Sequence, residues 1–213
     1  MSNVSGIRAR PIVFVVDDDV SVRESLELLI SQAGWQPETF ASAAAFLARK
    51  RVSSPCCLIL DVGLPDINGL DLQERVAADQ IEMPIIFITG YGDVPMTVRA
   101  MKAGAAEFLT KPFDDEMLLS AIRNAIERSE TALRHEADTR ALRDAYASLS
   151  RREREVMALV VSGYLNKQIA TRLGISEITV KAHRGKVMRK MTAGSLAELV
   201  NMAATLGVGR AVN

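Results

Sequence analysis

The chain has 213 residues, enough for two domains of ordinary size, and 48% of them are apolar, enough to bury two cores. Its first ten residues lack the apolar segment of a signal peptide, and no apolar run approaches a membrane span, so we expect a cytoplasmic protein without membrane contact. The net charge of zero conceals an acidic front, with 12 Lys/Arg and 18 Asp/Glu in residues 1–128, and a basic end, with 11 and 4 in residues 150–213. A basic end favours binding to a polyanion such as nucleic acid.

Five segments in the front half read as strands, and each is followed by a helical pattern; residues 12–16, 56–60 and 85–88 among them are unbroken apolar runs. Unbroken apolar runs of this kind are typical of strands that are buried on both faces, as in a parallel sheet. Strict alternation of strands and helices predicts an α/β domain with a doubly wound parallel sheet. The expected strands are residues 11–17, 35–40, 56–61, 84–89 and 106–110, and the expected helices are 22–33, 43–49, 69–78, 95–103 and one that starts near residue 114.

Right-handed crossovers bring the carboxyl ends of parallel strands to one edge of the sheet. The residues found there are Asp17, Asp18, Asp61, Thr89 and Lys111. Each alone is better explained by a helix cap or a turn, and Asp19 is expected to cap the next helix. Together, three carboxylates that repel one another predict a site for a hard divalent cation, Mg²⁺. Asp61 is then the candidate nucleophile for a phosphoryl group, with Thr89 and Lys111 holding the phosphoryl oxygens.

Residues 116–149 contain neither Pro nor Gly and carry a partial apolar stripe at helical spacing. This pattern predicts that the last front helix continues as a long linker helix. Two alternatives stay open from the sequence alone, an interruption near His135 and a flexible charged tether.

The basic end reads as four short helices. Ser150 and Glu153 form a capping box at the first of them, residues 166–173 form the second, and Ser176 caps the third; residues 195–206 would form the fourth. The turn that contains Gly174 makes the second and third helices a helix-turn-helix. We expect the third helix to bury Ile178, Val180, Val187 and Met191. Its outward face is nearly all basic, which favours DNA binding in the major groove.

The front domain resembles the receiver domain of two-component response regulators over residues 11–128. The resemblance rests on Val15-Val16-Asp17-Asp18-Asp19, Leu60-Asp61 with Leu64-Pro65-Asp66 and Gly69, Thr89-Gly90 and Lys111-Pro112-Phe113. It implies a five-stranded, flavodoxin-like fold in which Asp61 accepts a phosphoryl group from a sensor histidine kinase. Further implications are an Mg²⁺ site formed by Asp17, Asp18, Asp61 and the Gly63 carbonyl, a switch formed by Thr89, Phe108 and Lys111, and a cis Lys111–Pro112 bond. Phe108 is equally well explained as a core aromatic of the fifth strand.

The basic end resembles the LuxR-type DNA-binding domain from residue 149 to about 207. The motifs are Ser150-Arg151-Arg152-Glu153-Arg154-Glu155-Val156, Asn166-Lys167-Gln168-Ile169-Ala170 and Thr179-Val180-Lys181-Ala182-His183. The resemblance implies base contacts from Lys181, Ala182 and Gly185. It implies phosphate contacts from Lys167, Thr179, His183 and Arg184. Gly185 departs from many relatives, which carry a side chain there, so base readout would rest mainly on Lys181.

These features predict a FixJ/NarL-class response regulator, divided into a receiver (11–128), a linker helix (129–149) and a helix-turn-helix domain (150–213). Phosphorylation is expected to promote homodimerisation through the fourth-helix face around Val98 and Met101, and binding to promoter DNA. RNA polymerase is a candidate partner. Two alternatives remain. In the first, the chain is a constitutive DNA-binding dimer with a non-signalling receiver. In the second, it is a phosphatase with an Asp nucleophile. The second is disfavoured because Asp61-Val62-Gly63 lacks the carboxylate, two residues after the nucleophile, that such enzymes use as acid and base.

Overall fold

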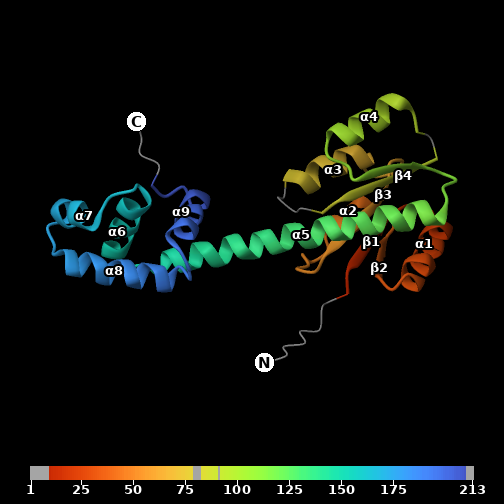
Figure 1. Cartoon of the computed structure of the whole chain (residues 1–213). Helices are drawn as coiled ribbons and strands as arrows, with labels where there is room; N and C mark the ends of the chain where they lie inside the picture. The colour runs from red at the N-terminus through yellow and green to blue at the C-terminus, as the bar shows by residue number, and fades with distance from the viewer. Residues whose placement is uncertain (1–9, 79–82, 91, 210–213) are drawn as a thin grey trace. The chain divides into compact units, whose positions relative to one another are not determined.

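The computed structural model describes residues 10–78, 83–90 and 92–209, and its contacts divide the chain into two compact units, Met1–Arg134 and His135–Asn213 (Figure 1). Within the described ranges, no helix combines the length and the apolar content that a membrane crossing requires.

The first unit is built on a five-stranded parallel sheet with the strand order β2-β1-β3-β4-β5. The doubly wound sheet expected from the sequence is therefore confirmed. The central strands are buried along their whole length, because helices cover both faces of the sheet. The strands are β1 (Ile12–Val16), β2 (Gln36–Phe40), β3 (Cys56–Asp61), β4 (Ile85–Thr89) and β5 (Glu107–Thr110).

Among the described residues of this unit, five helices begin: α1 (Val20–Gln32), α2 (Ala43–Leu47), α3 (Gly69–Ala78), α4 (Val94–Lys102) and α5 (Asp115–Ala147). Successive strand residues point to opposite faces, so each strand contributes to two cores. Phe14 and Leu58 pack with α2, α3 and α4 on one face, whereas Val15 and Ile59 pack with α1 and α5 on the other. Figure 1 shows α3 and α4 on the side of the sheet opposite to α1 and α5.

Short polar side chains begin these helices, as N-cap rules require. The Asp19 carboxylate accepts a hydrogen bond from the Ser21 amide at 2.8 Å, so Asp19 caps α1 as expected. The helix expected to begin at Pro95 begins one residue earlier, because the Asp93 carboxylate accepts from the Met96 amide at 2.7 Å.

The linker helix is continuous. α5 runs for 33 residues without a break at His135, so the interruption and the flexible tether considered from the sequence are both wrong. Its middle turns carry ion pairs at helical spacing, Glu130 with Arg134 and Glu136 with Arg140, which support an exposed helix that has little apolar surface to bury.

The second unit packs four helices and the last turns of α5 around one apolar core. The helices are α6 (Arg151–Val161), α7 (Asn166–Leu173), α8 (Glu177–Lys190) and α9 (Leu196–Thr205). α7 and α8 form the expected helix-turn-helix, and Gly174 takes the left-handed conformation (φ 64°) that the turn needs. In the first turn of α8 the sequence expectation was wrong, because Ile178 is 80% exposed while Val180 and Val187 are buried. Residues two apart lie about 200° apart around a helix, so Ile178 faces outward when Val180 faces inward.

Candidate functional site

The strand register brings the expected reactive residues to one edge of the sheet. Val16 pairs with Leu60, so Asp17 and Asp61 follow at the same level. Asp61 pairs with Ile88, which puts Thr89 one step further along the edge. Thr89 pairs with Thr110, and Lys111 follows. The four groups therefore line the carboxyl edge of neighbouring strands.

Three carboxylates meet at this edge. One oxygen from each of Asp17, Asp18 and Asp61 lies within 4.8 Å of the others. Asp17 and Asp61 are 1% and 8% exposed, whereas Asp18 is exposed to solvent. An all-oxygen set with one open side is what a hard divalent cation with some of its water shell requires, so the arrangement fits Mg²⁺.

Lys111 offsets part of the negative charge of Asp17 and Asp61. Its Nζ lies 2.7 Å from Asp17 Oδ2 and 3.4 Å from Asp61 Oδ1. Burial lowers the pKa of Lys111, but the hydrogen bond and charge of Asp17, together with the charge of Asp61, outweigh it and leave the pKa raised. Lys111 is therefore a firmly charged ammonium group within reach of both carboxylates. The Lys111–Pro112 peptide bond is cis, as the resemblance implies.

Asp61 stands at the end of β3 with one oxygen held by the backbone. Its Oδ2 accepts from the Gly63 amide at 3.1 Å. Burial raises the pKa of the Asp61 carboxyl and the charge of Lys111 lowers it, with a net rise. A carboxylate that is poorly solvated and held in one orientation is suited to attack an electrophile.

Thr89 and Phe108 both lie close to Gly92. Thr89 is buried and Phe108 is half-buried, with its ring 6.0 Å from that of Phe87. A Cβ atom on Gly92 would lie 3.3 Å from Thr89 Cγ2 and 3.1 Å from Phe108 Cε1. The β4–α4 loop therefore leaves no room for a side chain at residue 92, next to the two residues expected to form a switch.

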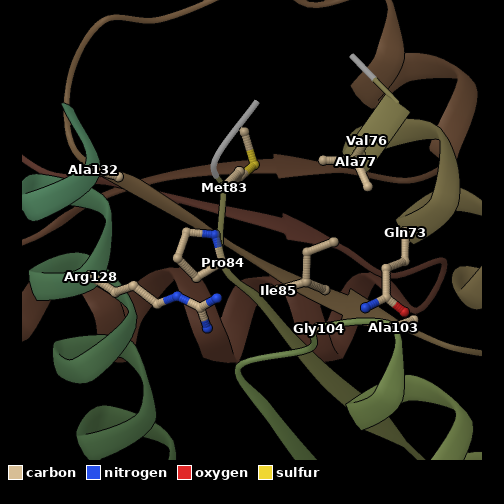
Figure 2. Close-up of a pocket in the computed structure, with 10 residues that line it drawn as sticks. All are labelled: Gln73, Val76, Ala77, Met83, Pro84, Ile85, Ala103, Gly104, Arg128 and Ala132. Carbon is tan, nitrogen blue, oxygen red and sulfur yellow. The ribbon is translucent and has the colours of Figure 1, made fainter. Parts of the chain in front are cut away.

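A separate hollow of about 320 Å³ lies at the opposite edge of the sheet, where β4 begins. Figure 2 shows Arg128 extending into it from α5, with Gln73 on the α3 wall. It contains none of the carboxylates, so it is not the reactive site. It is lined by Gln73, Val76, Ala77, Met83, Pro84, Ile85, Ala103, Gly104, Arg128 and Ala132.

In the second unit, α8 presents the residues that were expected to contact bases. Lys181, Ala182 and Gly185 are all exposed on its outer face, opposite the buried Val180 and Val187. This face is open, and a Cβ atom on Gly185 would meet no heavy atom within 4 Å.

The residues expected to contact phosphates differ in their exposure to solvent and in their hydrogen bonds. Lys167 is exposed on α7, whereas Thr179 shares a hydrogen bond with Ser176 at 2.8 Å. Arg184 Nη1 donates to Asn166 Oδ1 at 2.7 Å, which joins α8 to α7. His183 is half-buried, and its Nδ1 has no hydrogen-bond partner among the described residues.

Two polar contacts were not anticipated from the sequence. Asp66, in the loop after β3, accepts from the amides of Ala43 at 3.3 Å and Ala44 at 2.9 Å, so it caps α2 from a distance. These bonds lower the pKa of Asp66. Lys190, one of the basic residues of α8, donates to the buried Glu153 at 2.7 Å. No local sequence pattern predicts either contact, because the two partners lie more than 20 residues apart in the sequence.

Comparison with known proteins accounts for both units. Residues 13–123 match the family model of the response regulator receiver domain, and residues 147–203 match that of bacterial regulatory proteins of the luxR family. Nodulation protein W of Bradyrhizobium diazoefficiens is 49% identical over 93% of this chain and 88% of its own length. Response regulator protein TodT of Pseudomonas putida is 45% identical over 92% of this chain and 86% of its own length.

A solved structure supports the same assignment. The response regulator StyR is 46% identical, with a TM-score of 0.84, and the match covers 92% of this chain and 99% of StyR. Because these matches extend over nearly the full length of each relative, the likeness applies to both units and not to the front domain alone.

Proposed function

This chain belongs to the response regulators that join a receiver domain to a LuxR-type DNA-binding domain, and we propose that Asp61 is the residue on which it receives its signal. It is a phosphorylation-dependent transcriptional regulator, and its receiver implies a sensor histidine kinase as its partner. We propose that it consists of a receiver (11–128), a linker helix (129–149) and a DNA-binding domain (150–213). Because its target is promoter DNA, we propose that it acts in the cytoplasm.

The observation that carries this proposal is the cluster of Asp17, Asp18 and Asp61 with Lys111 at the carboxyl edge of the sheet. We propose that these three carboxylates and the Gly63 carbonyl hold Mg²⁺. When bound, Mg²⁺ would offset their negative charge and that of an incoming phosphoryl group.

The chain's own residues then perform the transfer. One oxygen of Asp61 attacks the phosphorus of a phosphohistidine whose other ring nitrogen carries a proton. The P–N bond breaks, its electron pair stays on the ring nitrogen, and the imidazole leaves as a neutral ring that keeps that proton. Lys111 Nζ is close enough to turn from the carboxylates to an oxygen of the new aspartyl phosphate. The Thr89 hydroxyl donates to another oxygen, and Phe108 follows the movement of Thr89 inward.

Transfer of a phosphoryl group to Asp61 can be measured without the kinase. Wild type incubated with acetyl phosphate and MgCl₂ should gain the mass of one phosphoryl group, and hydroxylamine should remove it, because the product is an acyl phosphate. Asp61→Asn should gain nothing. Asp66→Asn is the matched control: it makes the same chemical change five residues further on, in the loop after β3, and Asn can still cap α2. Equal labelling of Asp61→Asn and wild type would refute the assignment of Asp61.

We propose further that phosphorylation drives homodimerisation through α4. Val94, Val98 and Met101 are 76%, 44% and 44% exposed, which gives this helix an apolar face to cover. Two DNA-binding domains would then bind half-sites one helical turn apart, or a multiple of it. RNA polymerase is the proposed partner of the DNA-bound dimer. The proposed DNA contacts are Lys181, Ala182 and Gly185 to bases, and Lys167, Thr179, His183 and Arg184 to phosphates.

A further inference from the structure

Ile178 is the most exposed of the large apolar side chains among the described residues, at 80%. It lies in the first turn of α8, close after the N-cap Ser176, whose Oγ accepts from the Thr179 amide at 3.1 Å. An isoleucine side chain in water lacks the free energy that burial of its apolar surface would provide. Its position therefore favours a role in covering another molecule.

The position of Ile178 on α8 indicates that this other molecule is DNA. Lys181, Ala182 and Gly185 follow Ile178 by three, four and seven residues, the spacing that puts side chains on one face of a helix. All four are exposed, while Val180 and Val187 on the opposite face are buried. Ile178 thus extends, toward the helix N-terminus, the same stripe that we propose reads base edges. In helix-turn-helix proteins the N-terminal residues of this helix reach the base edges.

We propose that Ile178 reads a thymine, by packing against its C5-methyl group in the major groove. The inference rests on the proposed role of α8 as the DNA-reading helix. Among the groups that base edges present in the major groove, the thymine methyl is the apolar one, so it is the natural partner for an isoleucine. Lys181, one turn further on, would contact a guanine, and Gly185 offers no side chain. Each half-site is then expected to hold a specific thymine beside the base that Lys181 contacts.

A change in the DNA can remove this contact without touching the protein. With the phosphoryl mimic beryllofluoride and Mg²⁺ present throughout, full-length wild type first selects its preferred duplex from a random library. Each thymine of that duplex is then replaced singly by deoxyuridine, which lacks only the methyl. At fixed salt, wild type should lose roughly three- to tenfold in affinity at one thymine per half-site. Ile178→Ala should bind the unmodified duplex more weakly by a similar factor and should show no further loss when that thymine becomes deoxyuridine.

Leu165→Ala is the matched control. Leu165 is 69% exposed and also lies at the start of a helix, but it is the N-cap residue of α7 and is outside the stripe. This variant should keep the full wild-type response to deoxyuridine. Circular dichroism checks that both variants keep their helix content. The inference is overturned if Ile178→Ala responds to deoxyuridine as wild type does at every position. Failure of wild type to bind any duplex would instead refute the proposed function, so the two failures are distinguishable.

Discussion

Asp61 is held in place by a residue that has no side chain. Gly69, the first residue of α3, donates its amide to the Val62 carbonyl at 3.0 Å. A Cβ atom at this position would lie 2.7 Å from the Asp61 carbonyl oxygen and 3.0 Å from Val62 Cα. Both atoms belong to the backbone and cannot turn aside. The close approach of α3 to the end of β3 therefore requires glycine, although Gly69 touches no reacting atom.

Gly69→Ala should slow phosphoryl transfer because it displaces the backbone that carries Asp61. We expect the rate of labelling by acetyl phosphate to fall roughly ten- to a hundredfold, since small displacements of reacting groups are costly. The free energy of unfolding of the receiver should fall by about 1–3 kcal/mol, as overpacking usually costs. Intact-mass time courses measure the first effect and urea denaturation the second.

Gly90→Ala provides the control for Gly69→Ala. A Cβ atom on Gly90 would meet no heavy atom within 4 Å, so this change should leave labelling near the wild-type rate. If Gly69→Ala labelled as fast as Gly90→Ala, the claim that Gly69 positions Asp61 would be wrong.

At the level of elements, Glu153 ties together three helices of the DNA-binding domain. Its carboxylate accepts from the Ser150 amide at 2.8 Å, at the start of α6, and from Lys190 Nζ at 2.7 Å, in the last turn of α8. Lys190 also donates to the Ser148 carbonyl at 2.9 Å, just beyond the end of α5. The hydrogen bond from Lys190 and that from the Ser150 amide lower the pKa of Glu153 to about 2.

Glu153→Gln should destabilise the DNA-binding domain at neutral pH. The substitution removes a charged acceptor and leaves Lys190 beside an uncharged amide, so we expect a loss of about 1.5–3 kcal/mol. Thermal unfolding of the full chain, followed by circular dichroism at 222 nm, measures the loss. The surface variant Glu155→Gln should lose much less, because water screens its ion pairs with Arg151 and Arg152.

The same contact predicts a pH dependence. The folded-state pKa of Glu153 lies below the ordinary value of 4.5, so its contribution is fully present above pH 4.5 and is lost as the pH falls toward about 2. The difference in stability between wild type and Glu153→Gln should therefore shrink across this range. A difference that stayed constant down to pH 2 would show that the ionised carboxylate contributes nothing.

For the molecule as a whole, the sequence predicted what depends on local pattern. Apolar runs located the three central strands, β1, β3 and β4. The register of the strands brings Asp17, Asp61, Thr89 and Lys111 to one edge, as the topology requires. The ion pairs of Lys111 with two of these carboxylates agree with the expected clustering of the groups.

Contacts between distant residues could not be predicted in this way. Lys190 looked like one more basic residue on α8, but it is bonded to Glu153 on α6. Ile178 was assigned to the core because it is apolar, although its angular distance from Val180 puts it outside. Hydropathy alone cannot distinguish a buried apolar residue from one that stays exposed to contact a partner. The angular position of Ile178 around the helix, relative to Val180 and Val187, would have corrected its assignment to the core.

The central claim is that the state of Asp61 controls DNA binding. The most direct test measures the mass of the full chain by sedimentation, and its affinity for the selected duplex, with and without beryllofluoride and Mg²⁺. Wild type should dimerise and bind the duplex more tightly when the phosphoryl mimic is present, whereas Asp61→Ala should not respond. If both proteins bound the duplex equally well whether or not the mimic was present, the receiver would be a constitutive scaffold and Asp61 would not control DNA binding.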